Sequence, residues 1–501
     1  MKIWRWRTVV ALILAALFSA PAAAEWKRAE SDNFIVYSQA SDGALREQSA
    51  LLEDYHEFLR RLTNVTEPNA PNKLNIYMVK SAAQLRSIHT MPAGIAGVYI
   101  ASSDGIAAVV DESAPGQGQE TLLHEVAHHF MKQYRPLPYP AWYVEGFAEY
   151  VSTASFKKGA VELGRPSAGR AYTLVEGKWL PLDRILFGQV PTDRDGMSAF
   201  YAQSWLLAHY LLRSEELRPK FAAYLSAAAK GEDQRQAFAA SFPAPIAELE
   251  RELRTYTKRG MTYTRFSRAS DAAPPPVAIT RLPASADDLL LLRATMEVGP
   301  EDESALLAKV RAAAAKHDDI FARRVLAQAE ALFGDAAKAD ALLGTLLATN
   351  PNDPELLYFK GMRHLRSARA ASDGGEAAFK LARNAFAMAH KGNPDHWQTL
   401  LRYAEASQVT EAFRSDNTIN ILLLAHQLAP QVYEATMNAA QLLIARKRWA
   451  EAEQLLLPLT GDPHNPGLAN AARTMLATAR VRGARPAAPE EEAEEPAAAA
   501  E

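Results

Sequence analysis

The first hundred residues alternate short apolar runs with amphipathic stretches, a pattern that predicts strands and helices together. Residues 33–37 gather aromatic and β-branched side chains, as a buried strand does. Residues 44–62 instead place apolar side chains every three to four positions, as one face of a helix does. The turn residues 102–105 separate two further runs, which predicts an antiparallel hairpin. The predicted strands are 33–37, 73–79, 97–101 and 106–110, and the predicted helices are 44–62 and 82–88.

Beyond residue 119 the apolar spacing becomes mainly helical. This spacing continues to about residue 256, and the run Ala-Ala-Pro-Pro-Pro at 272–276 then predicts a stiff linker. Residues 282–482 are rich in alanine and leucine and predict one helix after another.

Three segments of this helical region share the same internal spacing. Each has small or apolar residues at offsets of 4 and 7 and a proline at 12, the pattern of the second helix of a tetratricopeptide repeat. Small residues let two helices approach closely, and the proline ends the second helix. A fourth unit is predicted around Ala440, Trp449 and Ala452, and 370–375 is an insertion; the alternative is a non-repetitive, alanine-rich helical domain. The matching positions are Ala339, Leu343, Leu346 and Pro351, then Ala382, Phe386, Ala389 and Pro394, then Thr418, Leu422, Ala425 and Pro430.

Both ends of the chain differ from the rest. Residues 1–24 have a basic start, an apolar run and three alanines before Glu25, which predicts a cleaved signal peptide. The alternative is an uncleaved anchor, but the apolar run is short for a span of about 20 residues. We therefore expect a periplasmic or secreted protein with no stable membrane insertion after cleavage. Residues 483–501 form an Ala/Pro/Glu tail that we expect to be disordered.

Composition narrows the chemistry. The 501 residues include no cysteine, which excludes disulfides, iron–sulfur clusters and thiol catalysis and leaves His, Asp and Glu as metal ligands. A formal net charge of −3 argues against nucleic acid as a partner.

The sequence His124-Glu-Val-Ala-His128 carries the candidate chemistry. Its two histidines are four residues apart on a predicted helix, so both imidazoles lie on one face and can share a metal ion. Glu125 lies beside that face and is placed to take a proton from a metal-bound water. Neutral imidazole suits zinc, the expected metal. The alternative is a charged helix face; apolar neighbours on both sides argue against it.

A second pair of acidic residues follows a proline-rich break. Glu145 and Glu149 are four apart on a predicted helix that begins near Ala141. Sixteen residues separate His128 from Glu145, enough for a turn that returns this helix to the first. Glu145 would complete a His₂Glu set with an open position for water. Glu149 would accept the free N–H of a ligand histidine, and the alternative is a solvated helix face.

Taken with Trp142-Tyr-Val-Glu-Gly-Phe-Ala-Glu149, the first motif resembles the gluzincin metallopeptidases, especially the aminopeptidase-N-like and peptidase-MA-like branches. The resemblance covers about residues 30–260 and implies Glu145 as the third zinc ligand. It also implies an oxyanion-stabilising tyrosine that opens a downstream helix. Tyr201 in Phe-Tyr-Ala-Gln-Ser-Trp is the candidate, and a buried structural tyrosine is the alternative.

The chain departs from that family at one point. The aminopeptidases carry a Gly-x-Met-Glu-Asn segment whose glutamate binds the substrate amine, whereas 97–101 reads Gly-Val-Tyr-Ile-Ala. We therefore expect an endopeptidase or a narrowly specific peptidase rather than an aminopeptidase. The edge of the hairpin strand 106–110 is expected to pair with an extended substrate.

These observations predict an α+β zincin-like metallopeptidase domain at 25–268, a linker at 269–281, and an all-α tetratricopeptide-type domain at 282–482. The leading hypothesis is peptide hydrolysis, with Glu125 as base, Tyr201 as oxyanion stabiliser and the repeats recruiting a protein partner. The alternative is a periplasmic binding or assembly scaffold whose metallopeptidase half is inactive. Hydrolysis of non-peptide bonds is a third hypothesis.

Overall fold

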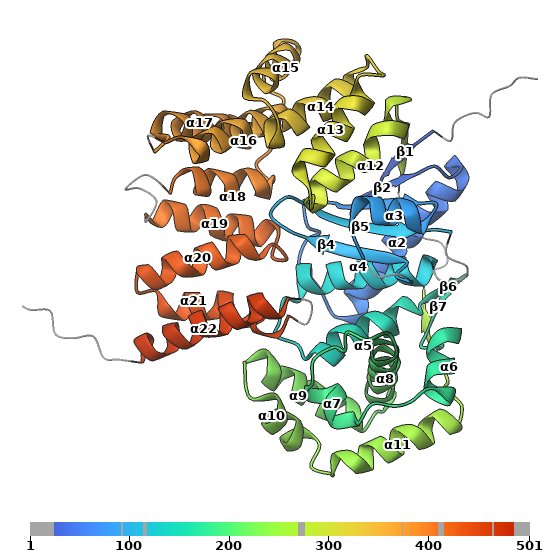
Figure 1. Cartoon of the computed structure of the whole chain (residues 1–501). Coiled ribbons are helices and arrows are strands. Elements are labelled where there is room, and N and C mark those ends of the chain that lie inside the picture. The colour runs from blue at the N-terminus through green and yellow to red at the C-terminus, as the bar shows by residue number, and fades with distance from the viewer. Residues whose placement is uncertain are drawn as a thin grey trace, which may run out of the picture.

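The structure is a computed structural model that describes residues 25–91, 94–113, 118–268, 276–372, 374–408, 415–462 and 465–484. The predicted signal peptide lies outside these ranges, as does the predicted acidic tail beyond residue 484. A mixed α/β half and a column of paired helices lie side by side (Figure 1). None of the described helices combines the length and the apolar character needed to cross a bilayer.

A six-stranded mixed sheet organises the first half, in the order β4-β5-β3-β2-β1-β9 among the described strands. Strands β2, β3 and β5 run parallel, while β4 pairs antiparallel with β5, and β1 pairs antiparallel with both β2 and β9. The bounds are β1 Lys27–Glu30, β2 Phe34–Ser38, β3 Leu74–Val79, β4 Gly97–Ala101, β5 Ile106–Asp111 and β9 Ala278–Arg281. A small antiparallel sheet contains β6 Ser155–Lys157, β7 Ala160–Leu163 and β8 Thr264–Ser267.

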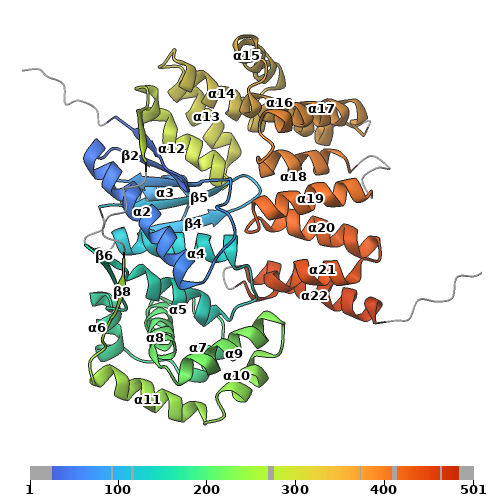
Figure 2. The same ribbon diagram turned by 180° about the vertical axis from the view of Figure 1, so that it is seen from behind.

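Helices cover both faces of the large sheet. Helices α2 (Asp42–Leu62) and α4 (Gly118–Tyr134) pack on one face, against side chains such as Ile76 and Val110. Helices α3 (Ala82–Ile88) and α12 (Ser285–Val298) pack on the other face, against Tyr77 and Val109. Figure 2 shows the same layers from behind. Because helices cover both faces of the sheet, side chains on both sides of the central strands are buried, which explains why these strands are apolar at most successive positions.

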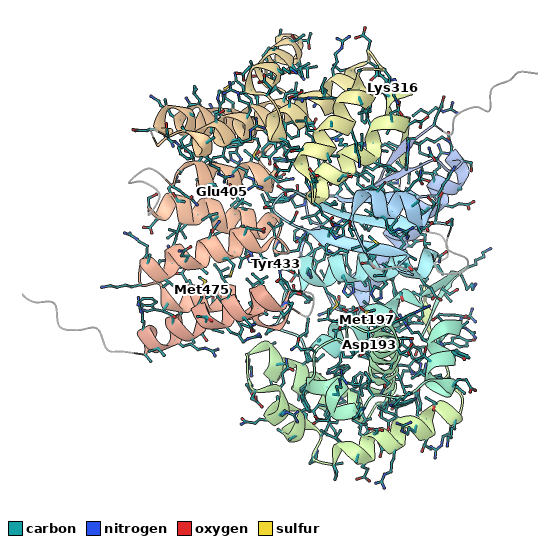
Figure 3. The ribbon with its side chains drawn as sticks, in the orientation of Figure 1. Asp193, Met197, Lys316, Glu405, Tyr433 and Met475 are labelled. Carbon is teal, nitrogen blue, oxygen red and sulfur yellow. The ribbon has the colours of Figure 1, made fainter. Side chains whose placement is uncertain are left out.

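Below α4, a helical lobe completes the first half. Helix α5 packs against both α4 and α8. Asp193 caps α8 by accepting from the Gly196 N–H at 2.8 Å (Figure 3). The helices of this lobe are α5 Ala141–Ser152, α6 Ala168–Glu176, α7 Leu182–Phe187, α8 Arg194–Arg213, α9 Leu217–Ala229, α10 Gln234–Ser241 and α11 Ile246–Lys258.

The second half is a stack of helix pairs, as the repeat pattern predicted. The positions at offsets 0, 4 and 7 all lie buried on α15, α17 and α19, and the prolines follow the ends of these helices. Among the described residues, the helices after α12 are α13 Glu303–Ala314, α14 Ile320–Phe333, α15 Ala336–Thr349, α16 Pro354–Ala370, α17 Glu376–Gly392, α18 Trp397–Ala406, α19 Asp416–Leu428, α20 Tyr433–Ala445, α21 Trp449–Leu456, η3 Leu457–Gly461 and α22 Pro466–Gly483.

The junction between the halves differs from the predicted linker at 269–281. Its described end forms β9, which pairs with β1 and extends the sheet. Helix α12, the first of the predicted helical domain, covers the sheet with Leu290 and Ala294 fully buried. Without β9, the edge of β1 would leave backbone polar groups unpaired. Without α12, one sheet face would leave apolar side chains uncovered. The helical half therefore begins as part of the core of the first half.

Candidate metal centre

Three predicted ligands converge between α4 and α5. The Nε2 atoms of His124 and His128 lie 2.9 Å apart. One carboxylate oxygen of Glu145, Oε2, lies 3.6 Å from the first of these atoms and 3.5 Å from the second. All three ligand atoms lie within 4.8 Å of one another, so this group could bind a metal ion. Two imidazole nitrogens and one carboxylate oxygen are a donor set that zinc accepts.

The local sequence explains how Glu145 reaches the histidines. Helix α4 ends at Tyr134, and a segment with prolines at 136, 138 and 140 follows it. Helix α5 then begins at Ala141 and packs back against α4. Its Glu145 side chain is fully buried, at 0% exposure. A carboxylate with no access to water needs a nearby cation or proton, which supports metal binding in this position.

The charges around His124 favour a cation. Burial disfavours the charged imidazolium, but the carboxylates of Glu145, Glu149 and Glu125 outweigh it and raise the pKa of His124 to about 9. The same negative potential attracts a metal ion, which competes with the proton for the Nε2 atom of His124.

Glu149 lies behind the first histidine. Its Oε1 is 3.4 Å from His124 Nδ1, the nitrogen that faces away from Glu145. Arg170 on α6 holds the same carboxylate with two parallel hydrogen bonds of 2.7 and 2.6 Å. Glu149 is therefore fixed in orientation from one side while it faces the imidazole on the other.

Tyr201 and Glu125 complete the surroundings. The Tyr201 ring lies 6.3 Å from the His124 ring, centroid to centroid, and nearly perpendicular to it. The Glu145 carboxylate, with burial and further acidic neighbours, raises the pKa of Tyr201 well above its usual value, so the phenol stays protonated. Glu125 is partly exposed on α4. Its charge acts on both His124 and Tyr201.

A close helix contact brings α8 to this site. A methyl group at Gly146, next to Glu145, would lie 2.4 Å from the carbonyl oxygen of Ser204. Only glycine permits that approach between α5 and α8. Tyr201 is three residues before Ser204, so the same contact sets its distance from the metal group.

Two other histidines near the site have structural partners. His129 points away from the group, and its Nδ1 lies 3.2 Å from the Tyr99 hydroxyl. Burial lowers the pKa of His129 to about 3, so it is neutral. His209 lies two turns beyond Tyr201, where its Nε2 is 3.0 Å from the Thr262 carbonyl oxygen. Neither side chain belongs to the metal group.

The prediction that strand 106–110 offers a free edge is wrong. This segment is β5, and its two neighbours, β4 and β3, occupy both of its edges. The run 107–110 is buried on both faces, which is typical of a central strand. Within the described sheet, the edge beside this region belongs to β4, Gly97–Ala101.

Two features of the site were not predicted from the sequence. Arg170 lies 21 residues from Glu149, at a distance that no helical or strand spacing connects. The repeat half also reaches the site: residues of α19, α20 and α21 line a pocket together with His128. Contacts between residues about 300 apart leave no local periodicity to read.

Comparisons with known proteins add little. No protein-family model matches the chain, and no curated protein matches its sequence. Among solved structures, the crystal structure of a thermophilic TPR protein of Thermus thermophilus matches 39% of this chain and 100% of its own, at 20% identity and a TM-score of 0.33. The repeat half is therefore identified by its own helix pairs.

Proposed function

We propose that this chain is an exported, zinc-dependent peptidase with a zincin-like metal half. One observation carries the proposal: His124, His128 and Glu145 converge within 4.8 Å between α4 and α5, where α4 also bears Glu125 and the Tyr201 ring of α8 lies 6.3 Å from the His124 ring. The ligand types and the motif order support zinc. Export rests on the signal-like residues 1–24.

Each side chain has a distinct role in this proposal. His124, His128 and Glu145 would hold the metal, and zinc supplies Lewis acidity toward water and a substrate carbonyl. Glu125 accepts the proton of the attacking water. Tyr201 donates its hydroxyl hydrogen to the oxygen that becomes negative in the transition state. A phenol with an ordinary pKa of about 10 carries that hydrogen at neutral pH.

The substrate is expected to bind as an extended chain along β4. This strand pairs with β5 on one side only within the described sheet, so its other edge has backbone groups to offer. Strand β4, Gly-Val-Tyr-Ile-Ala, has no carboxylate of its own in place of the missing amine-binding glutamate. Cleavage within a chain is therefore favoured over removal of an N-terminal residue.

The test is to measure zinc and cleavage on the same protein. Glu125→Gln should keep bound zinc and lose cleavage of an unfolded protein substrate by about 10²–10⁴-fold. Glu112→Gln is the matched control, because Glu112 is another partly buried carboxylate between β5 and α4. Zinc binding with no cleavage that depends on Glu125 would refute the peptidase.

A protein-binding scaffold is the second candidate. The stack of helix pairs supports it without any appeal to the metal group, because such stacks present extended surfaces to partners. Leu381 and Met388 lie seven residues apart on α17 with 50% and 47% exposure. If the scaffold is the function, Leu381→Asp should impair it while Glu125→Gln leaves it unchanged.

A further inference from the structure

A pocket lies where the two halves of the molecule meet. The end of α4, the turn that follows it and the start of α5 form one wall. The opposite wall comes from the α19–α20 turn, from α21 and from η3, about 300 residues later in the chain. Figures 1 and 2 both show these elements side by side. Both walls contribute apolar side chains, among them Met131 and Val144 on one side and Leu455 and Leu459 on the other.

The pocket continues from the metal group along one face of α4. His128 lines it, and Met131, Lys132 and Arg135 follow three, four and seven residues later. This spacing keeps them on the helix face that carries both ligand histidines. A polypeptide that reaches His128 therefore has the pocket next to it.

The charges in the pocket wall are largely neutralised by neighbours. Lys132 Nζ donates to the Tyr433 hydroxyl at 2.5 Å and lies 3.3 Å from an Asp462 oxygen. Arg135 donates to Glu67 at 2.8 Å. Figure 3 places Tyr433 on the side of the repeat half that faces α4. Paired charges leave the apolar side chains to select what enters, so an uncharged side chain is favoured.

Gln431 is one of the residues that line the pocket, and its buried amide oxygen accepts no hydrogen bond from the described residues. The halves also meet tightly beside the pocket, since a methyl group at Gly461 would lie 3.0 Å from the Tyr139 carbonyl oxygen. The pocket therefore persists although the two halves touch at Gly461.

We propose that this pocket binds one aliphatic side chain of the polypeptide substrate, so that the repeat half forms one wall of a specificity pocket beside the metal group. The proposal rests on the proposed peptidase function and gives the repeats a direct part in substrate selection. A residue such as leucine or methionine is expected at one position near the cleaved bond.

The absence of cysteine allows the pocket to be filled after folding. Leu455→Cys introduces a single thiol in the repeat wall, which N-phenylmaleimide then enlarges on the folded, full-length protein. Leu424→Cys is the matched control, since Leu424 lies on α19 of the same half, is 38% exposed and does not line the pocket. Modification after purification separates a blocked pocket from a failure to fold.

Cleavage sites in a degenerate peptide library, identified by mass spectrometry, provide the first measurement. The unmodified protein should favour leucine or methionine at one position by about 10–200-fold over glycine, as one pocket can. Modified Leu455→Cys should lose at least tenfold of this preference and still cleave glycine-containing peptides. Modified Leu424→Cys should behave as the unmodified protein. An unchanged preference in modified Leu455→Cys would overturn the pocket.

Peptide binding to Glu125→Gln separates the pocket from the peptidase. The probes are dansyl-Gly-Gly-Leu-Gly-Gly and its aspartate counterpart. Binding that requires leucine and is lost on modification at residue 455 supports the pocket, even if the native protein cleaves nothing and the peptidase is refuted. Cleavage without a leucine preference refutes the pocket alone. If the protein shows no leucine-dependent binding and no cleavage, both the pocket and the peptidase are refuted.

Discussion

Replacing Glu149 with glutamine tests whether this carboxylate supports the metal group from behind. The substitution keeps the size of the side chain and removes its charge. Glu149 Oε1 lies 3.4 Å from His124 Nδ1, and Arg170 holds the same carboxylate with bonds of 2.7 and 2.6 Å. Loss of the charge removes the acceptor that orients the imidazole and makes it a better ligand. It also leaves the Arg170 cation facing the site without its partner.

The expected magnitude follows from comparable metal sites. Loss of a carboxylate behind a ligand histidine lowers metal affinity about 10–100-fold, or about 1.4–2.7 kcal/mol. The uncompensated Arg170 charge acts in the same direction because it repels the metal ion. Bound zinc stabilises the folded protein through the same free energy, so the increase in Tm on adding zinc should be smaller in Glu149→Gln.

Competition with a chromophoric chelator measures zinc affinity directly, and thermal unfolding with and without zinc gives an independent value. Glu330→Gln is a matched control in the repeat half. Arg311 donates to Glu330 with bonds of 2.7 and 2.8 Å, so this variant loses a similar paired carboxylate far from the metal group. It should lose stability but bind zinc as the native protein does. If Glu149→Gln also binds zinc normally, the role assigned to Glu149 is refuted.

Three further predictions concern the fold around the site. Gly146→Ala should lower the free energy of unfolding by about 1–3 kcal/mol, measured by urea titration, because the new methyl group would lie 2.4 Å from the Ser204 carbonyl oxygen; an unchanged value would show that α5 and α8 can separate freely. Burial lowers the pKa of His209 to about 4, so the unfolded chain binds its proton first as the pH falls. The stability that neutral His209 contributes is complete above about pH 6.5 and is lost towards pH 4, by up to about 3 kcal/mol. Urea titrations across this range should show a shallower decline of the free energy of unfolding in His209→Gln than in the native protein. An equal decline in both proteins would contradict a neutral, buried His209. Tyr433→Phe should cost about 1–2 kcal/mol in the same assay, because it removes the hydroxyl that accepts from Lys132 and donates to Asp462; no loss would mean that water replaces the hydroxyl.

Local patterns were sufficient to predict many of the elements. Helix 82–88 and the hairpin at 97–101 and 106–110 were correctly predicted because each depends on neighbours in the chain. The offsets of 4, 7 and 12 likewise located α15, α17 and α19, since the buried face of a helix repeats within the helix itself. The metal group needed only the four-residue spacings and a turn between two helices.

Elements whose stability comes from distant partners were missed. Strand β1 reads Lys-Arg-Ala-Glu, and only its Ala29 is buried, so no alternating apolar pattern marks it as a strand. It forms because β2 and β9 both hydrogen-bond to it. The order of strands in the sheet is also a long-range property. The hairpin could be recognised, but nothing in its sequence showed that β3 would cover the outer edge of β5.

The position of the junction bears on the choice between peptidase and scaffold. A linker alone would keep a recruiting domain near an enzyme, because tethering raises the effective concentration of one part at the other. Here, instead, Lys132, one helical turn beyond His128, is enclosed by Tyr433 and Asp462 of the repeat half. A contact of that kind beside the metal group is expected where the repeats shape the site, and it has no evident use if they only bind a partner elsewhere.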